Sequence, residues 1–75
     1  MNILFKPIID EMFAGEGWTE FASPLEELDL PCTAETCRAA FDSLPDDIQF
    51  DAIQWGIGDT EIRDRAYVYL RDKNA

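Results

Sequence analysis

The 75-residue chain is 47% hydrophobic and carries sixteen acidic against six basic side chains, a formal net charge of −10. It is long enough for one domain, residues 1–75, and too apolar to be disordered despite its charge. A field this negative argues against direct binding to nucleic acid or to an anionic membrane, because both require a positively charged partner.

The acidic excess is concentrated in the first two thirds of the chain. Between Asp10 and Asp51 there are twelve acidic side chains and a single basic one, Arg38, whereas residues 52–75 carry four of each sign. A segment with this charge favours a basic protein surface as its partner. The alternative is that the charge only keeps a small protein soluble.

The first fourteen residues predict a short helix, with Pro7 in its first turn, where the missing N–H is tolerated. A short strand at the very start is the alternative. The predicted inner face of this helix consists of Ile8, Ile9, Met12 and Phe13.

Residues 15–22 predict a loop that carries two aromatic side chains, Trp18 and Phe21. We expect both to fold back over the core as a lid. The alternative is that they are exposed anchors for a partner, because Trp is enriched at binding hot spots.

Two short helices are predicted next. Ser23 and Pro24 indicate the N-cap and the first turn of a helix that ends at Pro31. Thr33 indicates the N-cap of another helix, which runs to about Ser43. The apolar stripe of this second helix consists of Ala34, Cys37, Ala40, Phe41 and Leu44.

The densest apolar content lies in a central helix predicted over residues 45–55. Apolar side chains project from both of its sides: Ile48, Ala52 and Trp55 from one, Phe50, Ile53 and Ile57 from the other. A helix of this kind is expected to be sandwiched between other elements. The strip left for water or a partner consists of Asp47, Asp51 and Gln54.

A last helix is predicted over residues 59–72, packed against the central helix after a turn in which Gly56 and Gly58 are free to take positive φ. Asp59 or Thr60 is expected to cap it. The run 66–70 also alternates well enough to form a strand, and periodicity leaves that choice open.

Cys32 and Cys37 lie five residues apart, and a disulfide between them is conceivable. The apolar stretch 3–9 is interrupted by Lys6 and Pro7, so we expect no signal peptide and a cytoplasmic setting with reduced thiols. The chain has no histidine, and two thiols alone are too few for a structural zinc site. We therefore expect no metal and no cofactor.

Catalysis is also not expected, because general acid–base chemistry near neutral pH most often uses histidine. The two C-terminal predicted helices resemble a helix-turn-helix in outline. A DNA-reading helix, however, presents basic and amide side chains, whereas Arg63, Arg65 and Arg71 alternate here with acids.

The carboxylates on neighbouring predicted helices are the candidate binding residues, with Trp18 as an aromatic anchor: Glu26, Glu27, Glu35, Asp42, Asp46, Asp47 and Asp51. Spread over adjacent helices, they could imitate the phosphate spacing of a nucleic acid. In size, acidity and composition the chain resembles the small phage- and plasmid-encoded anti-defence inhibitors, among them anti-CRISPR and anti-restriction proteins. That resemblance implies inhibition of a nucleic-acid-binding complex, in several cases by mimicry of nucleic acid.

The sequence thus predicts a single all-α domain of four or five short helices, with a non-catalytic function: docking through its acidic face on a basic nucleic-acid-binding protein or complex. The alternative is an interaction or scaffold module that docks through exposed aromatics, with Trp18, Phe21 and Tyr67 as candidate anchors. A homodimer is one form of that alternative, and the sequence leaves the oligomeric state open.

Overall fold

The computed structural model describes residues 3–74; Met1, Asn2 and Ala75 lie outside that range. Over the described residues the chain forms helices and no strand, which confirms the all-α prediction and places 66–70 in a helix. Five α-helices and two short 3-10 helices follow in the order η1 (Ile3–Phe5), α1 (Lys6–Met12), η2 (Gly17–Phe21), α2 (Ser23–Glu27), α3 (Ala34–Asp42), α4 (Asp46–Trp55) and α5 (Thr60–Lys73).

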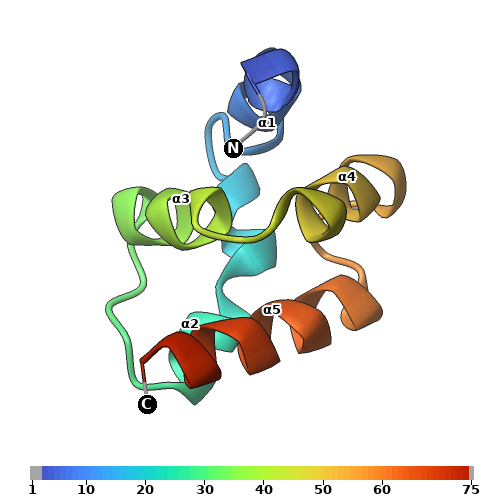
Figure 1. The fold of residues 1–75 in the computed structure, drawn as a ribbon. Helices are drawn as coiled ribbons and strands as arrows, with labels where there is room; N and C mark the ends of the chain where they lie inside the picture. Colours follow the sequence, from blue (N-terminus) through green and yellow to red (C-terminus); the bar gives the residue numbers. More distant parts are fainter. Residues whose placement is uncertain (1–2, 75) are drawn as a thin grey trace.

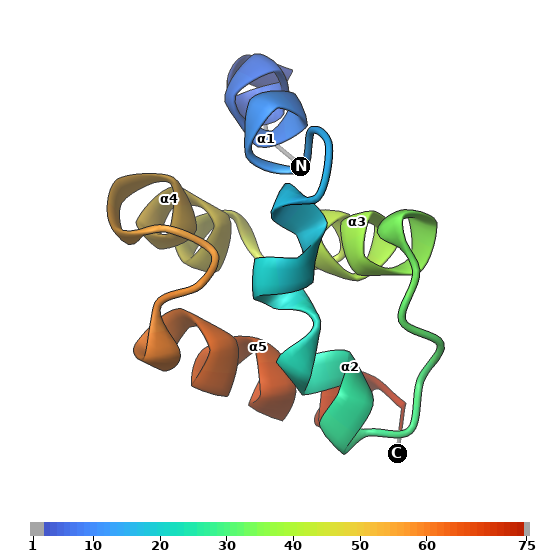
Figure 2. The same ribbon diagram turned by 180° about the vertical axis from the view of Figure 1, so that it is seen from behind.

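The elements are arranged around η2, which runs through the middle of the molecule. Figures 1 and 2 show α1 at one end, α2 and α5 at the other, and α3 and α4 between them. The η2 segment leads from α1 towards α2 and contacts both α2 and α3, while α5 contacts both α2 and α4. The predicted packing of the central helix against the last helix is therefore confirmed.

The connection between α4 and α5 is built from the predicted glycine turn and cap. Gly56 has φ 99°, a conformation that glycine adopts without strain, whereas Gly58 does not take positive φ. The Asp59 carboxylate accepts hydrogen bonds from the backbone N–H groups of Glu61 and Ile62 and so caps α5.

Three phenylalanine rings form the centre of the core. Phe21 and Phe41 are fully buried and meet nearly edge to face, with ring centroids 5.4 Å apart. Phe13 lies 5.2 Å from the Phe41 ring and 6.2 Å from the Phe21 ring. Offset and edge-on arrangements of this kind are favoured by the ring quadrupoles. The cluster connects the N-terminal segment, η2 and α3. It confirms that Phe21 packs on the core, but the predicted loop is wrong, because residues 17–21 form the 3-10 helix η2 in the middle of the molecule and not a lid over it.

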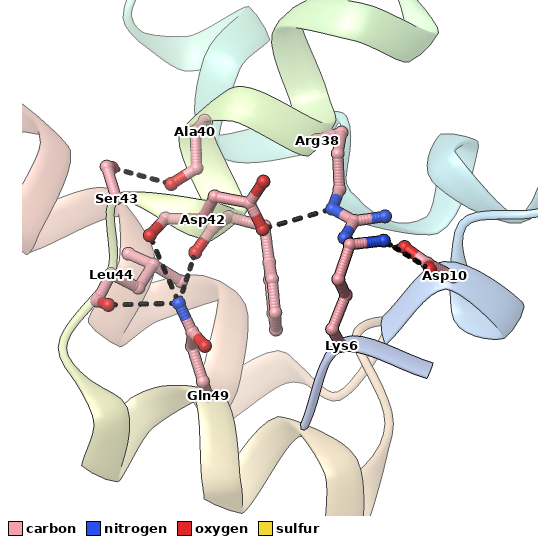
Figure 3. Close-up of polar contacts among 9 residues, drawn as sticks. Lys6, Asp10, Arg38, Ala40, Asp42, Ser43, Leu44 and Gln49 are labelled. Carbon is pink, nitrogen blue, oxygen red and sulfur yellow. Dashed lines mark hydrogen bonds and ion pairs between the residues drawn. The ribbon is translucent and has the colours of Figure 1, made fainter. Parts of the chain in front are cut away.

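The α3–α4 connection depends on Gln49, the one polar side chain that is completely buried among the described residues. Its Nε2 atom donates to the backbone carbonyls of Phe41 at 3.1 Å, Asp42 at 3.2 Å and Leu44 at 3.1 Å (Figure 3). The last carbonyls of a helix have no partner inside it. Gln49 therefore closes the C-terminal end of α3 from the neighbouring helix, a role that the sequence analysis did not predict.

Two predicted helix starts have different outcomes. Thr33 caps α3 as predicted, and its side chain accepts a hydrogen bond from the backbone N–H of Thr36 at 3.1 Å. The cap assigned to Ser23 is wrong: Ala22 occupies the N-cap position in the helical region, directly after η2, so Ser23 is already helical. The Ser23 hydroxyl instead accepts a hydrogen bond from Arg63 at 3.1 Å.

The helix α2 also ends earlier than predicted, at Glu27 rather than near Pro31. Asp29 takes φ 55°, a left-handed conformation that Asp tolerates better than most residues and that stops a helix. The chain then crosses to α3 without further helical structure.

Several predicted apolar faces are only partly buried. Ile8 is 46% exposed although Ile9 on the same helix and Phe13 just after it are buried, because α1 lies at the end of the molecule and packs on one side only. In the predicted stripe of α3, Cys37, Phe41 and Leu44 are buried and Ala40 is half-buried, while Ala34, in the first turn, is exposed.

The prediction that α4 is sandwiched on two sides is confirmed only in part. Its buried side consists of Ile48, Gln49 and Ala52. On the other side Phe50 is 45% exposed, with its ring centroid 6.0 Å from that of Phe5, whereas Ile53 packs against the core and Ile57, just after the helix, is buried. That side is therefore covered at Ile53 and Ile57 but open at Phe50.

Candidate functional site

Two basic side chains of the N-terminal half are held by carboxylates. Lys6 Nζ lies 2.8 Å from Asp10, and Arg38 bridges two helices, 2.8 Å from Asp10 on α1 and 3.0 Å from Asp42 on α3 (Figure 3). The pKa of Asp10 is held below its usual range mainly by the hydrogen bond from Lys6 and, next in size, by the one from Arg38. These two cations therefore already have internal partners.

The C-terminal half repeats this arrangement. On α5, Arg65 lies 2.6 Å from Asp51 and 3.6 Å from Asp47, both on α4. Arg71 pairs with its neighbour Asp72 at 3.3 Å. Four of the six basic side chains are thus engaged in ion pairs within the described residues.

Most of the acids have no such partner. Five acids form ion pairs: Asp10, Asp42, Asp47, Asp51 and Asp72. The other eleven are all exposed, and no ion pair links them to a base within residues 3–74: Glu11, Glu16, Glu20, Glu26, Glu27, Asp29, Glu35, Asp46, Asp59, Glu61 and Asp64. The unpaired carboxylates are therefore exposed to solvent, whereas most of the basic side chains are paired with carboxylates of the same chain.

The predicted binding carboxylates fall into two groups. Glu26 and Glu27 on α2, Glu35 in the first turn of α3 and Asp46 in the first turn of α4 are exposed and free of ion pairs in the described chain. Three others are partly neutralised, Asp42 by Arg38 and both Asp47 and Asp51 by Arg65.

The acidic strip predicted on α4 therefore faces a cation. Asp51 is about one third exposed, while Asp47 remains 76% exposed and reaches Arg65 at the longer distance. The structure brings Asp47 and Asp51 together through that one guanidinium. It distributes the other candidate carboxylates over α2, α3 and the start of α4, so that no single helix carries the acidic surface.

The aromatic candidates are placed differently from the prediction. Phe21 is completely buried, so its alternative role as an exposed anchor is wrong. Trp18 is half-buried and packs against the core. Tyr67 is half-buried, with the Arg71 guanidinium 5.8 Å from its ring centroid.

Trp55 is the most exposed aromatic side chain, at 69%. This differs from the prediction, in which it lies on a buried side of the central helix. Helical spacing does place it in line with Ile48 and Ala52, but it is the last residue of α4, and Gly56 turns the chain away there. Trp55 lines a depression of about 230 Å³ with Asp51 and Arg65 and with Asp59 and the first turn of α5. A helix-terminal position before glycine is the signal that could have identified it.

A second apolar region lies at the N-terminal end of the molecule. Ile3 is 80% exposed and Leu4 77% exposed, and both belong to η1. Ile8 on α1 is close to half exposed, as is Phe50 on α4, whose ring centroid lies 6.0 Å from that of Phe5.

The described residues offer little for covalent or metal chemistry. They contain no group of three or more side chains that could hold a metal ion together. Both cysteines are free thiols, and burial raises the pKa of Cys37, which lowers its thiolate fraction and hence its reactivity. No helix in residues 3–74 has the length and apolar character needed to cross a membrane.

No family model, curated protein or solved structure matches this chain.

Proposed function

We propose that this protein is a non-catalytic acidic binding protein that docks on a basic surface of a nucleic-acid-binding protein or complex and inhibits it. The observation that carries the proposal is the separation of charge: over residues 3–74, eleven exposed acids have no ion pair, whereas most of the bases are paired with acids of the same chain. A partner therefore meets a negative surface with few compensating cations.

A surface of this kind acts on a basic partner in two ways. It accelerates the encounter, because complementary charge steers diffusion, and it selects against acidic partners. In the sharper form of the proposal, inhibition is competitive: carboxylates on α2, α3 and α4 occupy the Lys/Arg groove that otherwise holds phosphates.

The first test is capture of partners from a host-cell lysate, with elution in steps of increasing salt, followed by competition with duplex DNA. We expect a nucleic-acid-binding protein to be released at moderate salt and to be displaced by the duplex. Release that needs denaturant, or partners that ignore the duplex, would contradict competitive docking.

Matched triple variants separate a directed surface from net charge alone. The first neutralises Glu26, Glu27 and Glu35 to Gln, and the second neutralises Glu11, Glu16 and Glu20. All six are exposed and unpaired in the described chain, so both variants change the charge equally without removing an ion pair. If the predicted residues carry the binding, the variant at Glu26, Glu27 and Glu35 should lower the affinity for the partner about tenfold, because each exposed ion pair contributes a few tenths to 1 kcal/mol. The other variant should lower the affinity much less.

A second candidate function is a docking module that uses apolar surface, in its simplest form self-association. The exposure of Ile3 at 80% and Leu4 at 77% favours it, since these two apolar residues are adjacent on η1. Sedimentation at low and high salt tests it. A dimer that persists at high salt and dissociates on Ile3→Ser supports this candidate, and a monomer at all concentrations removes it.

A further inference from the structure

An open groove with a volume of about 500 Å³ lies between α4 and α5. Ile48, Val68 and Tyr69 supply its apolar lining, and Asp47, Asp64 and Asp72 supply carboxylates around it. Val68 is 45% exposed, whereas Ile48 is buried beneath. The groove therefore combines an accessible apolar lining with acidic edges.

The arrangement follows from the helical repeat of α5. Asp64, Val68 and Asp72 are spaced four residues apart, so their side chains lie along one line of the helix. The two carboxylates are separated by eight residues, about 12 Å along the axis. Asp47 contributes the acid on the α4 side.

The charge of the groove is negative. Its one cation, Arg65, is held by Asp51 at 2.6 Å, and it reaches Asp47 only at 3.6 Å. Asp64 is exposed and has no ion pair within residues 3–74. Asp72 pairs with Arg71 in an exposed contact, which contributes little energy and is readily exchanged.

We propose that the groove receives an amphipathic basic helix of the partner protein, with an apolar side chain on Val68 and Tyr69 and Lys or Arg side chains towards Asp64, Asp72 and Asp47. Charge complementarity selects a basic occupant and disfavours a second copy of this chain, whose net charge is −10. The walls are helices whose backbone groups are bonded internally, so they offer no edge to an extended strand.

This inference rests on the proposed function for the class of partner, a basic protein, and adds the docking position and the form of the bound segment. It is testable with synthetic peptides of about 18 residues, five helical turns. One places leucines along a single helical face flanked by lysines, and the other has the same composition in scrambled order. Calorimetry gives the affinity, and nuclear magnetic resonance titration of the intact protein shows which amides respond.

We expect the amphipathic peptide to bind more tightly than the scrambled one and to shift the amides of Ile48, Val68 and Tyr69. Val68→Ser should weaken it roughly tenfold, the scale of one half-exposed apolar side chain. Asp64→Asn should weaken it roughly threefold. The matched controls, Ile8→Ser and Glu11→Gln, remove a half-exposed apolar group and an unpaired acid of the described chain outside the groove, and we expect less than about a twofold change.

Three outcomes would overturn the inference, and they separate it from the function on which it rests. If both peptides bind equally well, or the groove variants behave like their controls, binding is diffuse: the groove is not the site, while an acidic binding protein remains supported. If a dimer forms that Val68→Ser dissociates, the groove is a self-interface. If neither peptide binds at low salt, the inference and the proposed function fail together.

Discussion

The guanidinium of Arg65 lies 2.6 Å from the carboxylate of Asp51 and ties the middle of α5 to the middle of α4. Replacing Arg65 with Met leaves Asp47 and Asp51 without their cation. We expect a loss of about 0.5–1 kcal/mol in the free energy of unfolding, because both partners are about one third exposed and solvent screens the pair. Urea unfolding measures it.

Arg71→Met is the control, since it removes an equally charged side chain from a more exposed pair with Asp72. We expect less than about 0.5 kcal/mol there. Equal losses of unfolding free energy in the two variants would show that the Arg65–Asp51 pair contributes no more to stability than the exposed Arg71–Asp72 pair.

Gln49→Leu removes the buried amide that serves the carbonyls of Phe41, Asp42 and Leu44. The leucine preserves apolar volume but removes this donor from the carbonyls of Asp42 and Leu44, while the Phe41 carbonyl keeps the backbone N–H of Leu44; we expect a loss of about 2–4 kcal/mol in unfolding free energy. Gln54→Leu, an exposed amide on the same helix, should change it by less than about 0.5 kcal/mol. Similar denaturation midpoints for the two variants would refute this role of Gln49.

The lowered pKa of Asp10 makes one part of the stability depend on pH. The carboxylate is stabilised by Lys6 and Arg38 in the folded state, so its contribution is present above the ordinary pKa of 3.8 and is lost as the pH falls through the lower folded value. Asp10→Asn lacks this contribution. We therefore expect a difference in urea midpoint between wild type and variant near neutral pH that closes as the pH falls from about 5 to about 2.

Glu11→Gln is the matched control for this pH series. Glu11 is adjacent in sequence and exposed, and no ion pair links it to a base in the described chain. Its difference from wild type should stay small throughout. A difference for Asp10→Asn that grows towards low pH would contradict the assigned direction.

We expect alanine substitutions at Gly17 and Gly58 to have different effects on stability. A Cβ atom at Gly17 would collide with the backbone carbonyl of Met12, and a backbone atom cannot easily move aside. At Gly58 it would lie 3.5 Å from the Glu20 Cβ, an ordinary contact, and the φ there is not positive. We expect Gly17→Ala to lower the free energy of unfolding by roughly 1–3 kcal/mol, which thermal unfolding shows as a lower melting temperature. Gly58→Ala should leave the melting temperature unchanged or raise it slightly.

The parts of the fold that sequence predicts well are those specified locally. The N-caps Thr33 and Asp59 act on N–H groups two or three residues ahead, and Gly56 supplies the positive φ of its own turn. Helix existence along α3, α4 and α5 follows from apolar spacing in the same way. Such signals do not depend on the position of any other element.

What the sequence does not predict depends on which element lies opposite. Phe50 and Trp55 follow the same apolar spacing as their buried neighbours on α4, yet they are 45% and 69% exposed because no other element covers them. Gln49 is a polar residue and would be expected at the surface. Only the nearby C-terminal end of α3 explains why it is buried. The pairing of Arg38 with Asp10 likewise joins residues 28 positions apart.

The same limit applies to the candidate site. The excess of acids is readable from composition, but the pairing of Asp47 and Asp51 with Arg65 becomes visible only when α4 and α5 lie side by side. Glu26, Glu27, Glu35 and Asp46 are the predicted acids that remain free of ion pairs over residues 3–74. They are therefore better targets for binding variants than the central acids of α4.

The position of α1 at one end of the molecule has a consequence for the order in which the fold opens. This helix is attached to the rest through Ile9, the partly buried Met12 and the Asp10–Arg38 pair, whereas α5 contacts two other helices. Elements with fewer buried attachments open at lower free energy than the whole domain. The amide protons of α1 should therefore exchange with solvent deuterium before those of α5, and faster still in high salt, which weakens the ion pair.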